Sequence, residues 1–392
     1  MPNVNALDLN AQAYTLINAI HEQATGKTQI APTSTAEFTS VAGKLLAMGT
    51  DPLLGAISQV ISNTLFAVRG YSSKFDGLEV DATRWGNITR KINFGDSDAV
   101  EEESYALVDG ASYDHQKVRK PVVLETQFVG ADVMEDYWTI FDTQLDVAFH
   151  DEAEFMRFMS AFMLHIENKH TQWKENIGRT ALCNFIAAKN YADSGNVIHV
   201  LTEYNSDTGL NLTAQDVMQA SNFKAFIEWL NAKIETITDF MAERSQKYHI
   251  NITGYDINRH SALEDLKVYM LSEFMNKINS IVLPNEYHDT YLTLSDKKGL
   301  SYWQAIDDPD EIQVTPSYVD NATGAVMTAP AQTMTDVIGV IFDRDAVAIQ
   351  FPKETIIPAP RNARGQYTTF WYHLYYRMLN DLTENAVVLV LD

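Results

Sequence analysis

The most regular hydrophobic pattern in the chain runs from about residue 151 to residue 190 and has helical spacing. Apolar side chains recur there at mixed three- and four-residue steps, on one face of a helix: Phe155, Met159, Phe162, Ile166, Trp173 and Ile177. About 40 residues at a rise of about 1.5 Å give a rod of roughly 60 Å, which is long for a compact globule of this size. The segment is therefore predicted to be a structural spine.

Two more helices are predicted within a mixed region from about 205 to 360. Thr213 begins the first, because Asp216 lies three residues later with the spacing of a helix cap. An amphipathic stripe follows: Phe223, Phe226, Ile227, Leu230, Ile234, Ile237 and Met241. Ser261 and Glu264 have the spacing of a capping box and predict the second helix. That helix would carry Leu266, Met270, Phe274 and Ile278.

Strands are predicted in the second half of the chain. Residues Tyr248 to Ile257 have a strand-like pattern, and Val337 to Phe342 and Ala346 to Phe351 are two short apolar runs. A crossover or hinge is predicted next, at Pro352, Pro358, Pro360 and Gly365. Apolar and polar residues then alternate from Tyr367 to Met378, which is typical of a half-buried strand. Ala386 to Leu391 is predicted to be a final, fully buried strand.

The first 130 residues have weaker patterns. Residues 1 to 75 contain short apolar patches separated by Gly and Pro. They predict an extended arm that packs on another surface, with a poorly ordered terminus as the alternative. Residues 80 to 130 contain two extended segments around a turn signal at Asp109-Gly110, which predicts a long two-stranded ribbon. An isolated ribbon is only marginally stable in water, so we expect it to lie on another surface.

The two arms of this ribbon carry opposite charges. The first arm is acidic, with Asp96, Asp98, Glu101, Glu102 and Glu103. The returning arm is basic, with Lys117, Arg119 and Lys120. Charges of this kind select a register between neighbouring molecules more than they add affinity, so these residues are candidates for contacts between subunits. The alternative is a solvated hairpin whose charges pair locally and contribute little.

Composition and charge exclude several classes of protein. The chain has 392 residues, 46% of them hydrophobic, and a formal net charge of −23. This charge argues against a protein whose main role is to grip nucleic acid, because phosphates are neutralised by Lys and Arg. The single cysteine, Cys183, excludes an internal disulfide framework and a Cys-rich zinc site. Neither a signal peptide nor an apolar run of roughly 18 residues is present, so we expect a soluble protein without a membrane partner.

The search for catalytic motifs is negative. The sequence contains no phosphate-binding loop, no dinucleotide fingerprint and no nucleophile elbow. His165 and His170 lie five residues apart, which does not place two metal ligands on one helix face. The acidic run from 96 to 103 lacks the ligand spacing and the central Gly of a calcium loop. We therefore expect no metal, no cofactor and no enzymatic activity.

The order of these elements resembles that of the major capsid proteins of tailed bacteriophages, which have the Hong Kong 97-type fold. The clearest local carriers of the resemblance are the run from Val337 to Gln350 and the tail from Glu384 to Leu391. The chain length and the aromatic strand from Tyr367 to Tyr376 are most similar to the head proteins of small short-tailed phages. The resemblance covers nearly the whole chain but concerns layout, since the family has no short diagnostic motif.

The resemblance implies an α+β fold with five parts. These are an N-terminal arm (1–75), an extended β-ribbon loop (76–135), a peripheral domain with the spine helix (136–204), an α/β axial domain (205–364) and C-terminal strands that return to the peripheral domain (365–392). It also implies self-assembly into the pentamers and hexamers of an icosahedral head in the virion. Portal and scaffolding proteins would be partners, and packaged double-stranded DNA would be enclosed without sequence-specific binding. Assembly would take place in the host cytoplasm.

Two alternatives remain open from the residues alone. The same fold forms the shells of cellular nanocompartments, which would differ in their contents. A two-domain α/β enzyme with scattered carboxylates would instead have a deep pocket lined by acids with perturbed pKa values.

Overall fold

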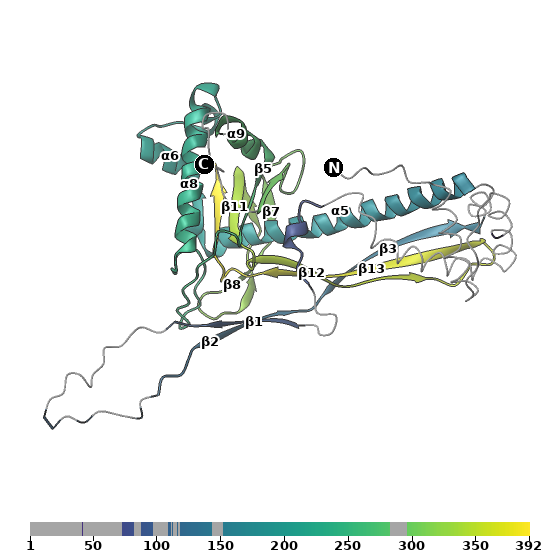
Figure 1. The fold of residues 1–392 in the computed structure, drawn as a ribbon, viewed down its shortest axis with the longest axis horizontal. Coiled ribbons are helices and arrows are strands. Elements are labelled where there is room, and N and C mark those ends of the chain that lie inside the picture. Colours follow the sequence, from purple (N-terminus) through teal and green to yellow (C-terminus); the bar gives the residue numbers. More distant parts are fainter. Residues whose placement is uncertain are drawn as a thin grey trace. The chain divides into compact units, whose positions relative to one another are not determined.

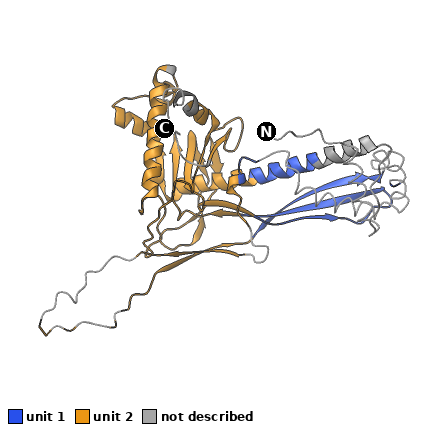
Figure 2. Ribbon diagram, in the orientation of Figure 1, with its two compact units in different colours: residues 1–76, 131–176, 351–377 blue, residues 77–130, 177–350, 378–392 orange. Residues whose placement is uncertain are grey.

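The structure is a computed structural model that describes residue 41 and residues 73–81, 88–96, 109–110, 112, 116, 118–142, 152–282 and 296–392. The chain divides into two compact units (Figure 2). Unit 1 comprises residues 1–76, 131–176 and 351–377, and unit 2 comprises residues 77–130, 177–350 and 378–392. The apolar patches predicted for the N-terminal arm lie outside the described residues. The division into five parts likewise stays a prediction.

The predicted spine is confirmed as helix α5 (Glu152–Ala192). Its residues up to 176 belong to unit 1 and its later residues to unit 2. Within the predicted apolar stripe, Ile166 and Ile177 are buried and Trp173 is half-buried. The side chains of the first turns, up to residue 163, lie outside the described part.

Unit 1 contains a three-stranded sheet that α5 covers on one face (Figure 1). The strand order is β12 (Val347–Pro358), β13 (Tyr367–Asn380) and β3 (Asp132–Phe141). The alternation predicted from residue 367 is confirmed, because the side chains that face α5 are buried at every second position from 368 to 374. The crossover predicted at Pro352, Pro358, Pro360 and Gly365 is wrong at its start, since β12 continues through Pro352 and ends at Pro358; the chain turns at residues 359–366, before β13. An edge strand tolerates proline because one row of its N–H groups needs no partner.

Beneath α5, a polar cluster connects the helix to this sheet. The ring of His170 stacks on Tyr372 with 3.5 Å between centroids. The hydroxyl of Tyr372 donates to Glu354 at 2.5 Å, and Lys174 pairs with the same carboxylate at 3.3 Å. Burial lowers the pKa of His170 to about 4 despite the nearby carboxylates of Glu354 and Asp136. The imidazole is therefore neutral at physiological pH.

Unit 2 is built around a five-stranded sheet. Its order is β4 (Val197–His199), β14 (Ala386–Val390), β11 (Val337–Asp343), β5 (Leu266–Leu271) and β6 (Asp296–Leu300). The strands predicted at 337–342 and 386–391 are confirmed as β11 and β14. Every residue of these two central strands is buried, which explains their unbroken apolar sequence.

In the described part of unit 2 beyond the end of α5, the α-helices are α6 (Val200–Thr208), α7 (Ala214–Val217), α8 (Ala220–Ala242) and α9 (Ser272–Val282). Thr213 caps α7 as predicted, and it forms a reciprocal capping box with Asp216. The helix is interrupted at residues 218–219, and α8 begins after this turn. Every apolar residue of the stripe predicted from 223 to 241 is buried along α8.

Two predictions in unit 2 are wrong. Tyr248 to Ile257 does not form a strand, although Tyr248 and Ile257 are buried. The side-chain oxygen of Asn251 accepts from the N–H of Ile257, and Gly254 has a φ of 90°, so the segment folds back as a loop. The helix predicted after residue 261 also begins later. Residues 266–271 form strand β5, because their apolar side chains are buried on both faces of the sheet.

A two-stranded ribbon is confirmed in the predicted region. Strand β1 (Ile88–Phe94) pairs antiparallel with β2 (Val123–Val129), so that Ile88 lies opposite Val129 and Phe94 lies opposite Val123. The remaining short elements are η1 (Asp76–Leu78), η3 (Ser194–Asn196), the pair β7 (Ile312–Val314) and β10 (Gln332–Met334), and the pair β8 (Ser317–Val319) and β9 (Val326–Thr328).

Candidate functional site

The ribbon has two different faces because successive side chains of a strand point to opposite sides. On β1, positions 89, 91 and 93 are half-buried, whereas positions 88, 90, 92 and 94 are exposed. On β2, Leu124 packs with Ile252 and Ile257 of unit 2 in a small apolar cluster. The paired strands β1 and β2 form the base of the ribbon, which we call the ribbon base. One of its faces therefore lies against the rest of its own unit, and the other faces solvent.

The inner face is anchored by a network of ion pairs. Lys91 pairs with Asp381 at 2.9 Å and also with Glu384. Arg259 pairs with Glu384 at 2.7 Å, and it donates to the side chain of Asn93 on β1 at 3.0 Å. Two cations and two carboxylates thus balance one another beneath the ribbon. A network of this kind fixes the position of β1 on the residues beneath it, because a buried charge is stable only when its ion-pair and hydrogen-bond partners are all in place.

The carboxylate of Asp381 is the most deeply buried member of this network, with 2% of its side chain exposed. It accepts from the N–H of Thr383 at 2.9 Å and from the hydroxyl of the same residue at 2.6 Å. Burial alone would raise its pKa, but Lys91 and these hydrogen bonds outweigh burial and hold the pKa below the ordinary value. Burial likewise opposes the charge of Lys91, yet Asp381 and Glu384 hold its pKa above the ordinary value. Both groups are therefore charged at neutral pH.

Asp96 follows β1 and contacts residues 244 and 258 elsewhere in unit 2. Its carboxylate accepts from the backbone and side-chain nitrogens of Asn258 at 3.0 and 2.9 Å, and it pairs with Arg244. The hydrogen bond from the backbone of Asn258 is the main reason that its pKa lies below the ordinary value. Gly95 precedes it, and a Cβ at this position would collide with the carbonyl oxygen of Tyr255. The backbone at Gly95 therefore passes very close to the backbone at Tyr255.

The other charged residues predicted for subunit contacts are only partly described. Arg119 and Lys120 are exposed in the returning arm. Asp98, Glu101, Glu102, Glu103 and Lys117 lie outside the described residues. The structure places Asp96 beside residues of its own chain, and the role of the whole set between subunits stays a prediction.

The outer face of the ribbon base is apolar, and we call it the ribbon face. It consists of Ile88, Ile92, Phe94, Val123 and Val129, all of them exposed. Phe94 is 66% exposed and Val129 is 65% exposed, which is unusual for side chains of this size in strands. Arg90 and Glu125 form an ion pair of 2.7 Å across the middle of the face. This face was not predicted from the sequence, although the spacing of Ile88, Ile92 and Phe94 could have indicated it.

A second apolar face lies on the unit 1 sheet, on the side away from α5. We call it the sheet face; it consists of Val133, Tyr137, Phe141, Tyr367 and Trp371. Tyr137 is 62% exposed, and its ring lies 5.1 Å from that of Trp371. The ring of Phe141 meets that of Tyr367 edge to face at 5.5 Å. Tyr367 and Trp371 are half-buried and occupy odd-numbered positions of β13. Their side chains therefore point to the opposite face of the sheet from the buried side chains at even-numbered positions.

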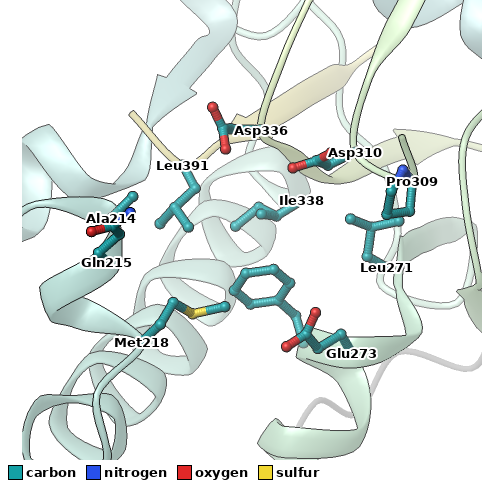
Figure 3. A pocket seen from close by; sticks show the side chains of 11 residues that line it. Ala214, Gln215, Met218, Leu271, Glu273, Pro309, Asp310, Asp336, Ile338 and Leu391 are labelled. Atoms are coloured by element: carbon teal, nitrogen blue, oxygen red, sulfur yellow. The ribbon is translucent and has the colours of Figure 1, made fainter. Parts of the chain in front are cut away.

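A pocket of about 390 Å³ lies in unit 2, and Figure 3 shows the side chains around it. Met218, Ile338 and Leu391 give it an apolar lining, and Asp310 and Asp336 lie at one side. Burial and the charge of Asp310 raise the pKa of Asp336 above its ordinary value. The described residues that line the pocket include no histidine, cysteine, serine or lysine. The two carboxyl groups therefore have no nucleophile or cation beside them in the lining.

The single cysteine, Cys183, is buried inside the protein. Burial raises the pKa of Cys183 to about 12, so the thiol is protonated and unreactive. Within the described part of the chain, no group of three or more His, Cys, Asp or Glu side chains is arranged to hold a metal ion. None of the helices among the described residues combines the length and apolar character of a membrane span.

Comparison with known proteins identifies the family. The model of the Phi29-like phage major capsid protein family matches residues 17–390. A chain in the capsid structure of Staphylococcus phage Andhra is 12% identical with a TM-score of 0.56, over 83% of this chain and 86% of that one. A chain in the structure of the head fiber and inner core protein gp22 of native bacteriophage P68 is 12% identical with a TM-score of 0.55, over 81% and 84%. No curated protein matches.

These matches confirm the expected mixed α and β fold of Hong Kong 97-type capsid proteins. They also favour a phage shell over the nanocompartment and enzyme alternatives, because the family model spans nearly the whole chain. The chain belongs to the Phi29-like phage major capsid protein family and is a structural protein of the phage capsid.

Proposed function

We propose that this chain assembles into the pentamers and hexamers of an icosahedral phage head that encloses packaged double-stranded DNA. The observation that carries the proposal is the family match over residues 17–390. The anchored ribbon supports it, because a two-stranded ribbon with an exposed apolar face gains stability from a neighbouring surface. The net charge of −23 suits a container, since an acidic inner wall repels phosphate and lets DNA slide.

The proposal includes the role of the charged ribbon arms. Asp98, Glu101, Glu102 and Glu103 on one arm, and Lys117, Arg119 and Lys120 on the other, would select the register between neighbouring subunits. Asp96 is better suited to hold the ribbon on its own unit, because it already binds Asn258 and Arg244. The subunit itself has no catalytic role.

Portal and scaffolding proteins are the other proposed partners, with assembly in the host cytoplasm and the mature protein in the virion. The five-part division stated above gives the proposed roles of the arm, the loop and the two domains.

Assembly of the purified protein tests the proposal. The chain is expressed alone and together with a scaffolding protein, and the products are examined by sedimentation velocity and negative-stain microscopy. We expect shells or capsomers in at least one of the two preparations. A strictly monomeric protein at high concentration in both would contradict the proposal.

The contribution of the arms is tested by reversing charges. A variant with Lys117→Glu, Arg119→Glu and Lys120→Glu should remain folded by circular dichroism but fail to assemble. Adding lysines at Asp98, Glu101 and Glu102 should restore part of the assembly, because the signs are again opposite. Normal shells from the first variant would show that the arms do not select the register.

A further inference from the structure

The pocket in unit 2 has an apolar wall and an acidic side (Figure 3). Met218, Ile338 and Leu391 belong to the apolar wall, and Asp310 and Asp336 lie together at the acidic side. The volume of about 390 Å³ lies within the range of pockets that hold small molecules. We propose that this pocket binds a small organic cation, with an ammonium group on an apolar body. Every lining residue belongs to unit 2 of one chain, so this binding needs no assembly and goes beyond the proposed function.

The two carboxyl groups of the acidic side lack a cation that would balance them. Neither Asp310 nor Asp336 forms an ion pair within the part of the chain that the structure describes. Burial and the charge of Asp310 raise the pKa of Asp336, and the exposed Asp392 adds to this effect. Carboxylates that repel one another in this way are stabilised by an opposite charge close to both. The ammonium group of the ligand would supply that charge.

The other polar groups of the lining compete little for the ligand's charge. Glu273 already pairs with Lys277, one turn later on α9, so its charge is balanced within the helix. Gln215 is neutral and exposed. Asp310 and Asp336 are therefore the groups that would bind the ammonium group.

The apolar wall favours an organic cation over a metal ion. Met218, Ile338 and Leu391 are joined there by Leu271 and Phe274. An apolar body that covers these side chains removes them from water, which a hydrated metal ion cannot do. Ca²⁺ and Mg²⁺ take six or more oxygen ligands. Among the residues that the structure describes, no group of three or more His, Cys, Asp or Glu side chains is arranged to hold a metal ion.

The acidic side is held in place by backbone hydrogen bonds. The carbonyl oxygen of Asp310 accepts from the N–H of Val337 at 3.1 Å, and that of Asp336 accepts from the N–H of Leu391 at 2.8 Å. Ile338 of the wall belongs to the central strand β11. A site that is ordered before binding loses little conformational entropy when a ligand binds. This order favours the binding of a ligand with few atoms.

Ligand-observed NMR of the purified full chain tests this binding. Saturation-transfer difference spectra detect weak ligands on subunits and on shells alike. The probe is n-hexylammonium, for which we expect a dissociation constant of about 1 mM or below. The neutral 1-hexanol and the anionic hexanoate should bind about tenfold or more weakly, because they lack the positive charge. Methylammonium should also bind about tenfold or more weakly, because it lacks the apolar body.

Competing ligands distinguish the other possible occupants. Displacement of hexylammonium by Mg²⁺ at equal concentration would show a site for inorganic ions and overturn the proposal. Tighter binding of the peptide acetyl-Gly-Lys-Gly-amide than of hexylammonium would assign the pocket to a protein side chain instead. Binding of 1-hexanol as tight as that of hexylammonium, or no binding of hexylammonium, would likewise contradict it.

Isosteric substitutions locate the binding within the molecule. The double variant Asp310→Asn with Asp336→Asn removes both charges, and asparagine tolerates the left-handed backbone of Asp336, whose φ is 59°. We expect hexylammonium to bind this variant about tenfold or more weakly, and 1-hexanol to bind within about twofold of its wild-type affinity. The matched control Asp307→Asn changes an exposed residue outside the lining and should leave both affinities unchanged. Unchanged affinity for hexylammonium in the double variant, or in Asp310→Asn alone if the double variant is unfolded by circular dichroism, would overturn the proposal.

Discussion

Replacing Lys91 by methionine tests how the ribbon is held on unit 2. The substitution keeps most of the aliphatic stem but leaves Asp381 without its cation, while Glu384 keeps Arg259. Removing one partner of a buried ion pair costs about 3–5 kcal/mol. The side chain of Lys91 is itself 22% exposed and Asp381 keeps its bonds from Thr383. We therefore expect a loss of about 2–3 kcal/mol in the free energy of unfolding.

The assay compares this variant with Arg90→Met, the neighbouring residue on the opposite face. Arg90 forms an exposed ion pair with Glu125, whose loss should cost less than about 1 kcal/mol. Urea unfolding measures the free energies, and hydrogen exchange measures the protection of the β1 and β2 amides. The double variant Lys91→Met with Asp381→Asn should be more stable than the sum of the single losses predicts, because the stranded charge is gone. A Lys91→Met variant no less stable than Arg90→Met would refute the anchoring role of the network.

Three other predictions concern the interior. Burial lowers the pKa of His170 to about 4, so on acidification the unfolded chain binds a proton at this imidazole before the folded chain does. The free energy of unfolding should therefore fall by up to about 3 kcal/mol as the pH is lowered from 6.5 towards 4. A His170→Phe variant whose stability has the same pH dependence as the wild type would contradict this. Gly95→Ala should lower the melting temperature measurably, because its Cβ would meet the carbonyl oxygen of Tyr255, whereas Gly195→Ala has open space and should have little effect. Cys183 should react with a thiol reagent only at the rate of unfolding, since its pKa of about 12 keeps the thiol protonated; rapid labelling of the native protein would show that it is accessible.

Long periodic patterns predicted the fold well. The stripes of α5 and α8 and the alternation of β13 repeat over many residues, so each element is specified several times along the sequence. Leu266 to Leu271 was misinterpreted because a short apolar run buried on both faces also fits the spacing of a helix. Tyr248 to Ile257 was misinterpreted because side-chain hydrogen bonds from residues such as Asn251 replace the ladder of a sheet.

The candidate site was predicted less well than the fold. Opposite charges on the ribbon arms are visible in the sequence, but the anchoring network is not. Lys91 and Asp381 are 290 positions apart, and only the folded chain brings them together. The ribbon face was missed because its alternation covers only seven residues of β1 and includes Arg90. The sheet face depends on β3 and β13 pairing, which the separate patterns of the two strands do not reveal.

A cryo-electron microscopy map of particles assembled from the expressed chain would show what covers the ribbon face. We expect a closed shell in which the ribbon face of each copy is covered by a neighbouring copy. Particles that leave the ribbon face exposed to solvent, or a ribbon face covered by its own chain, would contradict it.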